Sequence, residues 1–473
     1  MSKVAFINPP FLKGFSRYSR SPCVTRGGTL YYPVMLALGT GYLQKNGHEV
    51  LLIDAIAENK KTREVLSKLT NFKPDIIVIE TSTPSINKDI NFAKESKRLM
   101  NRAKIVLVGR HFNKKETAEK LLKKEKEIDI IARKEFYDEV LDLANKKSLR
   151  SIKGITYIQN KKIKSNIDGK PINPDDLPFV SKIYKEFLDY KKYFYASLRY
   201  PYLMLQFGYG CPFGCAFCNE MHHASYRHRS IKNFIEELEY IEKNFPDVKE
   251  LHLDDPTFYI NNEITKELCE VMIKKRFKFK WSTNVRCNVP LDILKLMKKA
   301  GCRLVHVGIE NINQDVLTKI NKGIKSDTIT RFLFDAKKAG ILVHACFIMG
   351  LPGDTEITLR KTLDYAKAVP LDSIQAFPLI PTPGELSYDW AKNKGYLISE
   401  DYSQWLNKNG GYNCVISRPD LTKEQVEWWA EKFYKEFIFR ISFVLYKIKQ
   451  SLKSWQEFKR NFKTFLKFRG YKK

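Results

Sequence analysis

Three cysteines lie within one stretch of eight residues, Cys211-Pro-Phe-Gly-Cys215-Ala-Phe-Cys218. This stretch contains a glycine and comes soon after the apolar run 202–207. Three thiolates at this spacing can bind three irons of a cubane cluster and leave the fourth iron open. The spacing therefore predicts a 4Fe–4S cluster that binds and reduces a small molecule, rather than one that only transfers electrons.

A structural zinc site is the alternative for these thiols. Such sites usually combine two separated pairs of Cys or His into four ligands. No second Cys-x-x-Cys pair follows, although His222 or His223 could supply a fourth ligand. With zinc, the chain would be a basic, nucleic-acid-associated protein rather than a redox enzyme.

Other residues able to do chemistry stand at the ends of apolar segments in the same region. They are Asp254, Asp255, Arg286, Glu310, Gly350 and Pro352. The segments are expected strands at 202–207, 250–254, 279–283, 304–309, 342–348 and 373–379, with helical stretches between them. This alternation predicts a partial (β/α)6 barrel, in which the C-terminal strand ends meet at one mouth.

A second strand–helix alternation occupies the N-terminal third of the chain. Its expected strands are 4–8, 49–54, 75–80, 105–109 and 128–132. Five strands with helices between them predict a doubly wound parallel sheet, whose ligands bind beyond the C-terminal strand ends. The residues expected at that edge are Pro10, Thr81, Ser82, Gly109 and His111.

These patterns divide an α/β chain into four parts. We predict a sheet domain at 1–145, a hairpin and proline-containing linker at 146–194, the partial barrel at 195–405, and a basic, aromatic helical region at 406–473. In this order the active edges of the sheet and of the barrel can face one cavity.

The Cys-x-x-x-Cys-x-x-Cys spacing, with Phe217 just before the last cysteine, resembles the signature of the radical SAM superfamily. The resemblance implies that Cys211, Cys215 and Cys218 hold a 4Fe–4S cluster whose open iron binds S-adenosylmethionine. It also implies that Phe217 belongs to the cofactor-binding loop. An electron from a donor such as flavodoxin or ferredoxin then cleaves the cofactor to methionine and a 5′-deoxyadenosyl radical.

The other strand ends are similar to S-adenosylmethionine-binding positions of that superfamily. By resemblance, Asp254 and Asp255 contact the ammonium group, and Arg286 neutralises the carboxylate. Glu310 contacts the methionine part or the ribose hydroxyls, and the turn Gly350-Leu-Pro352 packs near adenine.

The N-terminal sheet resembles the cobalamin-binding domain of one branch of the superfamily. That branch includes proteins similar to the anaerobic magnesium-protoporphyrin monomethyl ester cyclase and to hopanoid-associated radical SAM proteins. The resemblance implies that cobalamin contacts Pro10, Thr81, Ser82, Gly109 and His111. The Asp-x-His-x-x-Gly motif is absent, and Gly109-Arg110 stands where Gly-Gly is usual. A domain that has kept the fold and lost cobalamin is the alternative.

Together these likenesses imply a cobalamin-dependent radical SAM methyltransferase. The radical would take a hydrogen from the substrate, methylcobalamin would give the methyl group, and a second S-adenosylmethionine would remethylate the cobalt. A cyclase or rearrangement catalyst that uses the same radical is the alternative. No residue identifies the substrate, and the large apolar substrates of similar proteins favour a small-molecule or lipid-like one.

The chain is strongly basic, with a net charge of +29. Lys and Glu alternate in stretches such as 123–127, which is typical of solvated helix faces, so we expect no nucleic-acid partner. Residues 421–473 carry 14 Lys and Arg against 5 Asp and Glu, with closely spaced aromatics. They predict either a helical cap packed on the barrel or an interfacial helix at a membrane.

Six of the nine cysteines stand apart from the cluster, which fits a reducing compartment. The chain starts without the pattern of a signal peptide, and no apolar run reaches the ~20 residues of a membrane span. We therefore expect a cytoplasmic protein, with peripheral membrane contact through the C-terminal region as a further option.

Overall fold

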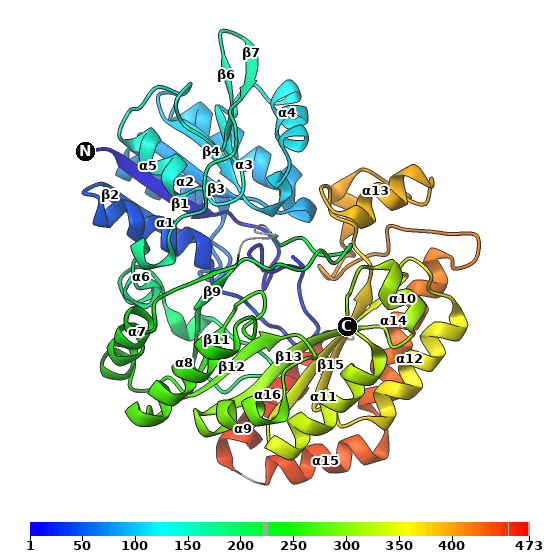
Figure 1. Ribbon diagram of the computed structural model, residues 1–473. Helices are drawn as coiled ribbons and strands as arrows, with labels where there is room; N and C mark the ends of the chain where they lie inside the picture. Colours follow the sequence, from blue (N-terminus) through cyan, green and yellow to red (C-terminus); the bar gives the residue numbers. More distant parts are fainter. Residues whose placement is uncertain (221–225, 453, 472–473) are drawn as a thin grey trace.

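Two β-sheets with their helices make up the protein, one above the other in Figure 1. The computed structural model describes residues 1–220, 226–452 and 454–471. The N-terminal sheet lies at the upper end of the view, the barrel-like sheet lies below it, and the last two helices lie at the lower end.

The first sheet has the strand order β2-β1-β3-β4-β5-β6-β7. Its parallel strands are β1 (Lys3–Asn8), β2 (Glu49–Asp54), β3 (Ile76–Glu80), β4 (Lys104–Val108) and β5 (Ile130–Ala132). The predicted hairpin, β6 (Ile155–Gln159) and β7 (Lys162–Ser165), extends this sheet antiparallel to β5. That attachment was not predicted, because nothing in the hairpin sequence specifies its neighbour.

Helices cover both faces of the first sheet, as its almost uniformly apolar strands require. Side chains alternate between the two sides along each strand: Val4 and Phe6 point to one core, and Ala5 and Ile7 to the other. The first core includes side chains of α1 (Val34–Lys45) and α5 (Tyr137–Ala144), and the second those of α2 (Thr62–Phe72), α3 (Ile86–Leu99) and α4 (Lys115–Lys124).

The second sheet has six parallel strands in the order β15-β14-β13-β12-β11-β8. They are β8 (Tyr202–Leu205), β11 (Glu250–Leu253), β12 (Lys280–Val285), β13 (Cys302–Glu310), β14 (Leu342–Met349) and β15 (Ser373–Pro378). The helices of this half are α7 (Ile231–Asn244), α8 (Asn262–Lys275), α9 (Leu291–Lys299), α10 (Gln314–Lys319), α11 (Ser326–Ala339), α12 (Glu356–Ala368) and α13 (Leu386–Asn393). The α/β fold class and the partial barrel are confirmed.

Residues 9–33, between β1 and α1, run from the first sheet to the barrel. The Leu30 amide donates to the Phe194 carbonyl at 2.7 Å, and the Val24 amide to the Gly410 carbonyl at 2.8 Å. Tyr32 stacks on Tyr193 with ring centroids 3.9 Å apart. This stretch, called the strap below, therefore joins the two halves over most of its length.

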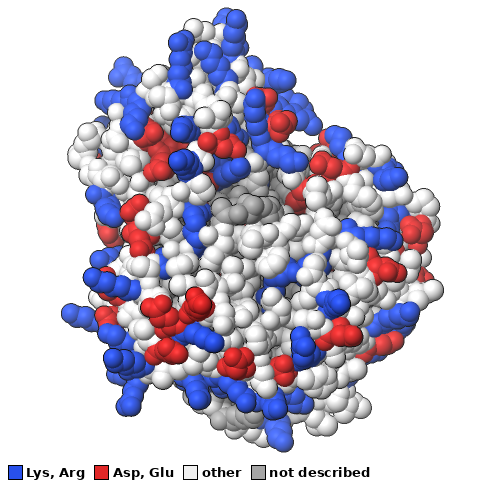
Figure 2. Space-filling view, viewed as in Figure 1, with Lys and Arg blue, Asp and Glu red and all other residues white. Residues whose placement is uncertain are grey.

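Three helices end the chain: α14 (Lys423–Ile438), α15 (Ile441–Ser451) and α16 (Trp455–Tyr471). In the described part of the chain, no helix is long and apolar enough to cross a membrane. Figure 2 shows Lys and Arg spread over the viewed face and interleaved with Asp and Glu, rather than gathered in one stripe.

Candidate active site between the two sheets

The three cysteines lie in the loop that follows β8, at the C-terminal end of the first barrel strand. Predicted as one strand to 207, this segment instead ends at Leu205 and is followed by the short strand β9 (Gly208–Tyr209). β9 pairs antiparallel with β10 (Arg227–His228), so the base of the loop is closed by a two-stranded clamp. β9 and β10 have two residues each, too few to show an alternating pattern, so the sequence could not predict them.

The barrel holds the loop at its centre. The Ala216 amide donates to the Ile320 carbonyl at 2.9 Å, and the Ala216 carbonyl accepts from the Ser387 amide at 2.9 Å. Arg286, just after β12, lies over the Phe213 ring with its guanidinium carbon 3.8 Å from the centroid. Its Nη1 is 3.7 Å from the Cys215 sulfur. The predicted arginine is thus beside the cysteines, and although burial raises the pKa of Cys211, the Arg286 charge acts to lower it.

The three cysteine sulfurs are the type of ligand that an iron–sulfur cluster requires. Soft thiolates select iron–sulfur clusters, copper(I) and zinc over hard cations. Burial raises the pKa of the Cys211 and Cys218 thiols, and the Glu220 carboxylate adds to both effects. Metal binding there must therefore release protons. Among the described residues, no three His, Cys, Asp or Glu side chains are gathered around a single metal ion. The three thiols are nevertheless near enough for the charge of Cys215 to raise the pKa of both Cys211 and Cys218, in addition to burial.

The two aspartates after β11 have different surroundings. Asp255 accepts from the Phe207 and Gly208 amides at 2.9 and 2.8 Å, and so fixes the turn that leads into the cysteine loop. Asp254 accepts from Asn284 Nδ2 at 3.1 Å and lies 3.0 Å from Arg20 Nη1. Burial alone would raise the pKa of Asp254, but the Arg20 and His252 charges hold it well below its usual range. Burial raises the pKa of Asp255 to about 7.

Glu310 ends β13 and is buried with a cationic partner. Its Oε1 lies 3.0 Å from Lys322 Nζ, and both side chains are buried. Glu310 has a φ of 65°, an uncommon conformation for a residue with a side chain. Lys322 also lies over the Phe217 ring at 5.4 Å, and its carbonyl accepts from Arg286. Lys322 thus links three of the predicted site residues, and no motif marks it.

The turn after β14 is fixed by Asp354, whose carboxylate accepts from the Gly350 and Leu351 amides at 3.0 Å each. Gly350 has a φ of 87°, which favours glycine. Pro352 is half-buried in this turn. Arg418 donates to the Leu351 carbonyl, so the region before α14 also supports the turn.

Two arginines from the N-terminal half hold the end of the cysteine loop. Arg20 Nε of the strap lies 3.2 Å from Glu220 Oε2, and Arg110 Nη1 lies 3.5 Å from the same oxygen. Arg110 also donates to the Asn219 carbonyl at 3.1 Å. Asn219 and Glu220 follow Cys218 directly, so both halves of the protein position this loop. No motif marks Arg20 or Glu220, because their contact joins segments 200 residues apart.

The residues predicted at the edge of the first sheet do come together there. Thr81 donates through its hydroxyl to the Val108 carbonyl at 2.8 Å, and Ser82 bonds Ser85 at 2.7 Å. His111 lies 3.0 Å from the Thr83 hydroxyl through Nδ1. Burial lowers the pKa of His111 to about 3, with Lys120 adding to the effect, so its ring is neutral. Pro10 is half-buried just beyond β1.

A cradle is present at this edge, but it is largely filled. Gly109 has a φ of 125°, and a Cβ atom built on it would collide with the Thr81 carbonyl oxygen. The neighbouring Glu80 Oε2 is buried without a hydrogen-bond partner. The cavity here has a volume of about 10 Å³, because side chains that include Tyr18 and Arg110 fill the space. These residues fit cobalamin, which could approach the backbone at Gly109 provided that the Tyr18 and Arg110 side chains move.

Two residues of the zinc alternative, His222 and His223, lie outside the described residues. Tyr226 is described, and its ring packs against Gly208 at the base of the loop.

Comparison with protein families agrees with this two-part site. Residues 205–366 match the radical SAM superfamily, and residues 22–143 match the B12 binding domain. The chain carries a radical SAM domain and a B12-binding domain. The B12-binding match includes the C-terminal ends of β2 to β5, and the radical SAM match includes those of β8 and β11 to β14 together with the cysteine loop. The matches give no support to a nucleic-acid-associated protein with a structural zinc.

Similar proteins include enzymes of known and unknown substrate. This radical SAM protein is 27% identical, over 85% of its length and 88% of the relative's, to an uncharacterized methyltransferase of Pyrococcus horikoshii. It is 28% identical to the anaerobic magnesium-protoporphyrin IX monomethyl ester cyclase of Rubrivivax gelatinosus, over 77% of this chain and 65% of that one.

The fold is also that of a solved structure. The radical S-adenosylmethionine methyltransferase TsrM from Kitasatospora setae, with cobalamin and a [4Fe-4S] cluster bound, superposes with a TM-score of 0.70. The alignment covers 92% of this radical SAM protein and 91% of that chain, at 15% sequence identity.

Proposed function

We propose that this enzyme transfers a methyl group to an unactivated carbon of a small-molecule or lipid-like substrate by cobalamin-dependent radical SAM chemistry. One observation carries the proposal: the cysteine loop ends at Glu220, whose carboxylate lies against Arg20 and Arg110 of the B12-binding half. The two cofactor-binding halves therefore meet at the loop itself.

Cys211, Cys215 and Cys218 would hold the 4Fe–4S cluster, which when bound supplies the electron for reductive cleavage of S-adenosylmethionine. Arg286 would support the cluster by its contact with the Cys215 sulfur, and its contact with Phe213 orients the guanidinium. The half-buried loop limits the access of water to these sulfurs.

Asp254, Glu310, Phe217 and the turn at Gly350 would bind S-adenosylmethionine. The Asp254 carboxylate is held ionised and can accept from an ammonium group, once Arg20 shares or releases it. Asp255 would act as a positioning residue, because its carboxylate holds the turn into the cysteine loop.

Gly109, Thr81, Ser82, His111 and Pro10 would line the cobalamin site, and cobalamin when bound supplies the methyl group. The support is the cradle at Gly109 and the unpartnered oxygen of Glu80. The neutral His111 ring is held by Thr83, so it would offer packing and a hydrogen bond rather than charge.

We propose a cytoplasmic enzyme with an electron donor such as flavodoxin or ferredoxin and with peripheral membrane contact through the C-terminal region. We also propose the domain bounds 1–145, 146–194, 195–405 and 406–473 for this enzyme. A cyclase or rearrangement catalyst is the second candidate, and the similarity to proteins named as cyclases favours it.

Anaerobic reconstitution with iron, sulfide and hydroxocobalamin tests the proposal. After reduction in the presence of S-adenosylmethionine, we expect 5′-deoxyadenosine, and S-adenosylhomocysteine once a methyl acceptor is supplied. Chain-bound cobalamin is measured by its absorption after gel filtration. Formation of 5′-deoxyadenosine without S-adenosylhomocysteine, over a panel of acceptors that are consumed, would favour the second candidate.

Matched variants locate each function. Cys215→Ala should abolish 5′-deoxyadenosine formation, and Cys269→Ala, a buried cysteine of α8, should not. Gly109→Ala should lose bound cobalamin through the collision with Thr81, whereas Gly47→Ala meets no atom within 4 Å. Equal cobalamin retention in the two glycine variants would contradict the proposed edge site.

A further inference from the structure

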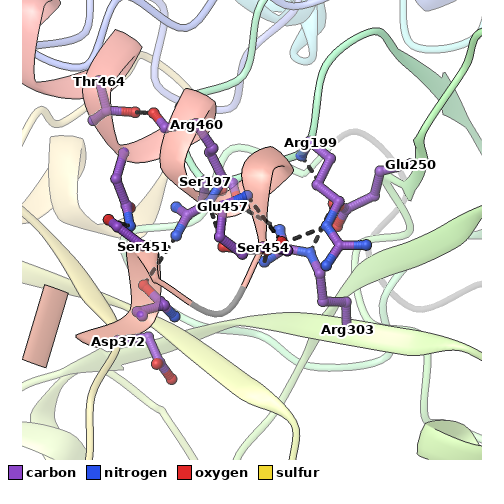
Figure 3. Close-up of polar contacts among 12 residues, drawn as sticks. Ser197, Arg199, Glu250, Arg303, Asp372, Ser451, Ser454, Glu457, Arg460 and Thr464 are labelled. Atoms are coloured by element: carbon purple, nitrogen blue, oxygen red, sulfur yellow. Dashed lines mark hydrogen bonds and ion pairs between the residues drawn. The ribbon is translucent and has the colours of Figure 1, made fainter. Parts of the chain in front are cut away.

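The last two helices turn their polar side toward the protein. Gln450, Glu457 and Arg460 are 4%, 6% and 9% exposed. Glu457 Oε1 accepts from Arg199 Nε at 3.1 Å, and Glu457 Oε2 from Arg460 Nε at 3.0 Å (Figure 3). Arg303 Nη1 also lies 3.7 Å from Glu457. This polar network attaches the hairpin α15–α16 to the barrel.

The opposite side of the hairpin carries large apolar side chains. Ile441, Leu452 and Trp455 are 78%, 81% and 66% exposed. Trp455, Phe458 and Phe462 form a row of parallel rings, with centroids 5.2 and 5.9 Å apart. The members of this outer face are Ile441, Leu445, Ile448, Leu452, Trp455, Phe458, Phe462 and Leu466. Exposed apolar surface of this continuity marks an interaction site.

The charge of the hairpin indicates what covers that face. Residues 440–473 carry eleven Lys and Arg but a single acidic residue, Glu457. Glu457 and its partner Arg460 both point into the protein, which leaves ten cations and no carboxylate in the rest of this segment. Lys459 lies over the Trp455 ring at 5.1 Å, so cations flank the aromatic row. A second copy of this chain would bring like charges together, whereas an anionic lipid surface offers opposite charge and an apolar layer beneath it.

We propose that the outer face of the α15–α16 hairpin binds the surface of an anionic lipid bilayer. The helices have 11 and 17 residues and no described helix can span a membrane, so the hairpin lies in the plane of the interface. Leu445, Leu452 and the aromatic row enter the acyl boundary, and lysines contact the headgroups. The inference goes beyond the proposed chemistry and does not rest on it.

The place of the hairpin sets the orientation of the enzyme. Its partners Arg199 and Arg303 lie at the N-terminal ends of β8 and β13, whereas the cysteine loop lies at the C-terminal end of β8. The membrane would therefore lie at the end of the barrel opposite the active site (Figure 1). The hairpin anchors the enzyme and does not pass a substrate directly from the bilayer to the site.

Co-sedimentation with lipid vesicles tests the proposal on the full chain. We expect binding to phosphatidylcholine vesicles that contain phosphatidylglycerol, about tenfold weaker binding without it, and weakening by salt. Leu445→Ser with Leu452→Ser should lower binding at least about tenfold, because two exposed leucines no longer enter the bilayer. The matched control is Leu99→Ser with Ile357→Ser, which removes exposed apolar side chains from α3 and α12.

Circular dichroism should show that the leucine variant is folded, and its cleavage of S-adenosylmethionine should be unchanged. Absence of vesicle binding by the unaltered protein would overturn the proposal, as would binding that the leucine changes leave intact. Self-association of the unaltered protein that the leucine variant loses would show that a second copy covers the face instead. A failure of radical chemistry would leave the vesicle result unaffected, so the two proposals are tested separately.

Discussion

A single guanidinium, that of Arg286, contacts three parts of the cysteine loop and its support. It lies over Phe213, approaches the Cys215 sulfur and donates to the Lys322 carbonyl. The planar, forked group of arginine can do this, whereas the point charge of lysine cannot stack and donate in two directions at once.

We expect Arg286→Lys to lower the iron content of the reconstituted enzyme about tenfold at limiting iron, since loss of a supporting contact weakens metal binding by that order. The measurement is iron and sulfide per chain, with secondary structure followed by circular dichroism. Arg331→Lys, at an exposed position of α11, is the control and should bind iron normally. Equal iron content in both variants would show that Arg286 does not support the cluster.

Spacing in the sequence predicted those site residues that follow strands, such as the cysteines and Glu310. Each stands at a strand end, and parallel strands bring their C-terminal ends to one edge of the sheet independently of the conformation of the loops. Lys322, Arg20 and Glu220 could not be predicted in this way. Lys322 follows a helix, Arg20 lies in the strap and Glu220 ends the cysteine loop. In such irregular segments no regular spacing of apolar residues indicates the direction in which a side chain points.

At the scale of elements, strand and helix positions followed from alternating apolar runs. The aromatic side of α14 packs inward, as predicted for a helical cap, but the orientation of α15 and α16 was not predicted. An aromatic helix is expected to turn its apolar side inward. Here Glu457 meets three arginines, Arg199, Arg303 and Arg460, and this polar contact orients α16 the other way.

The attachment of α16 should depend on pH. Burial alone would raise the pKa of Glu457, but the three arginines lower it to about 2, from 4.5 in the unfolded chain. A depressed folded pKa contributes stability above about pH 4.5 that is lost as the pH falls toward 2. Glu457→Gln should lower the free energy of unfolding by about 3 kcal/mol at neutral pH and by much less near pH 2.

Urea unfolding of the two proteins at neutral and acid pH measures this difference, in which other titrating groups cancel. Glu424→Gln, at an exposed position of α14, is the control and should change little at either pH. A destabilisation by Glu457→Gln that is the same at both pH values would contradict the assigned role.

At the scale of the whole molecule, the strap couples the two halves. Arg17 pairs with Asp89 inside the first half, with both side chains buried, whereas Arg20 reaches Asp254 and Glu220 of the barrel. Resemblance to the two families predicted both halves, but not this connection, because contacts between domains depend on the packed surfaces of each.

Arg20→Gln should loosen the strap without unfolding either sheet. We expect backbone amides of residues 9–33 to exchange hydrogen about tenfold faster, equivalent to about 1.4 kcal/mol, while those of β1 and β3 are unchanged. Lys13→Gln, an exposed change in the same segment, is the control. If exchange in the strap is the same in both variants, Arg20 does not hold the halves together.

The two arginines of the strap also imply an order of events during synthesis. Arg17 finds Asp89 only 72 residues later in the chain, so the N-terminal sheet can take up its own part of the strap early on the ribosome. Arg20 must wait for Asp254, 234 residues further on, which at usual translation rates takes on the order of ten seconds or more. During this interval Arg110, which stands beside Gly109, has not yet met its barrel partners Asn219 and Glu220. In the nascent chain the Arg110 side chain is therefore not held by the cysteine loop, and it is freer to leave the cradle at Gly109 than in the finished fold.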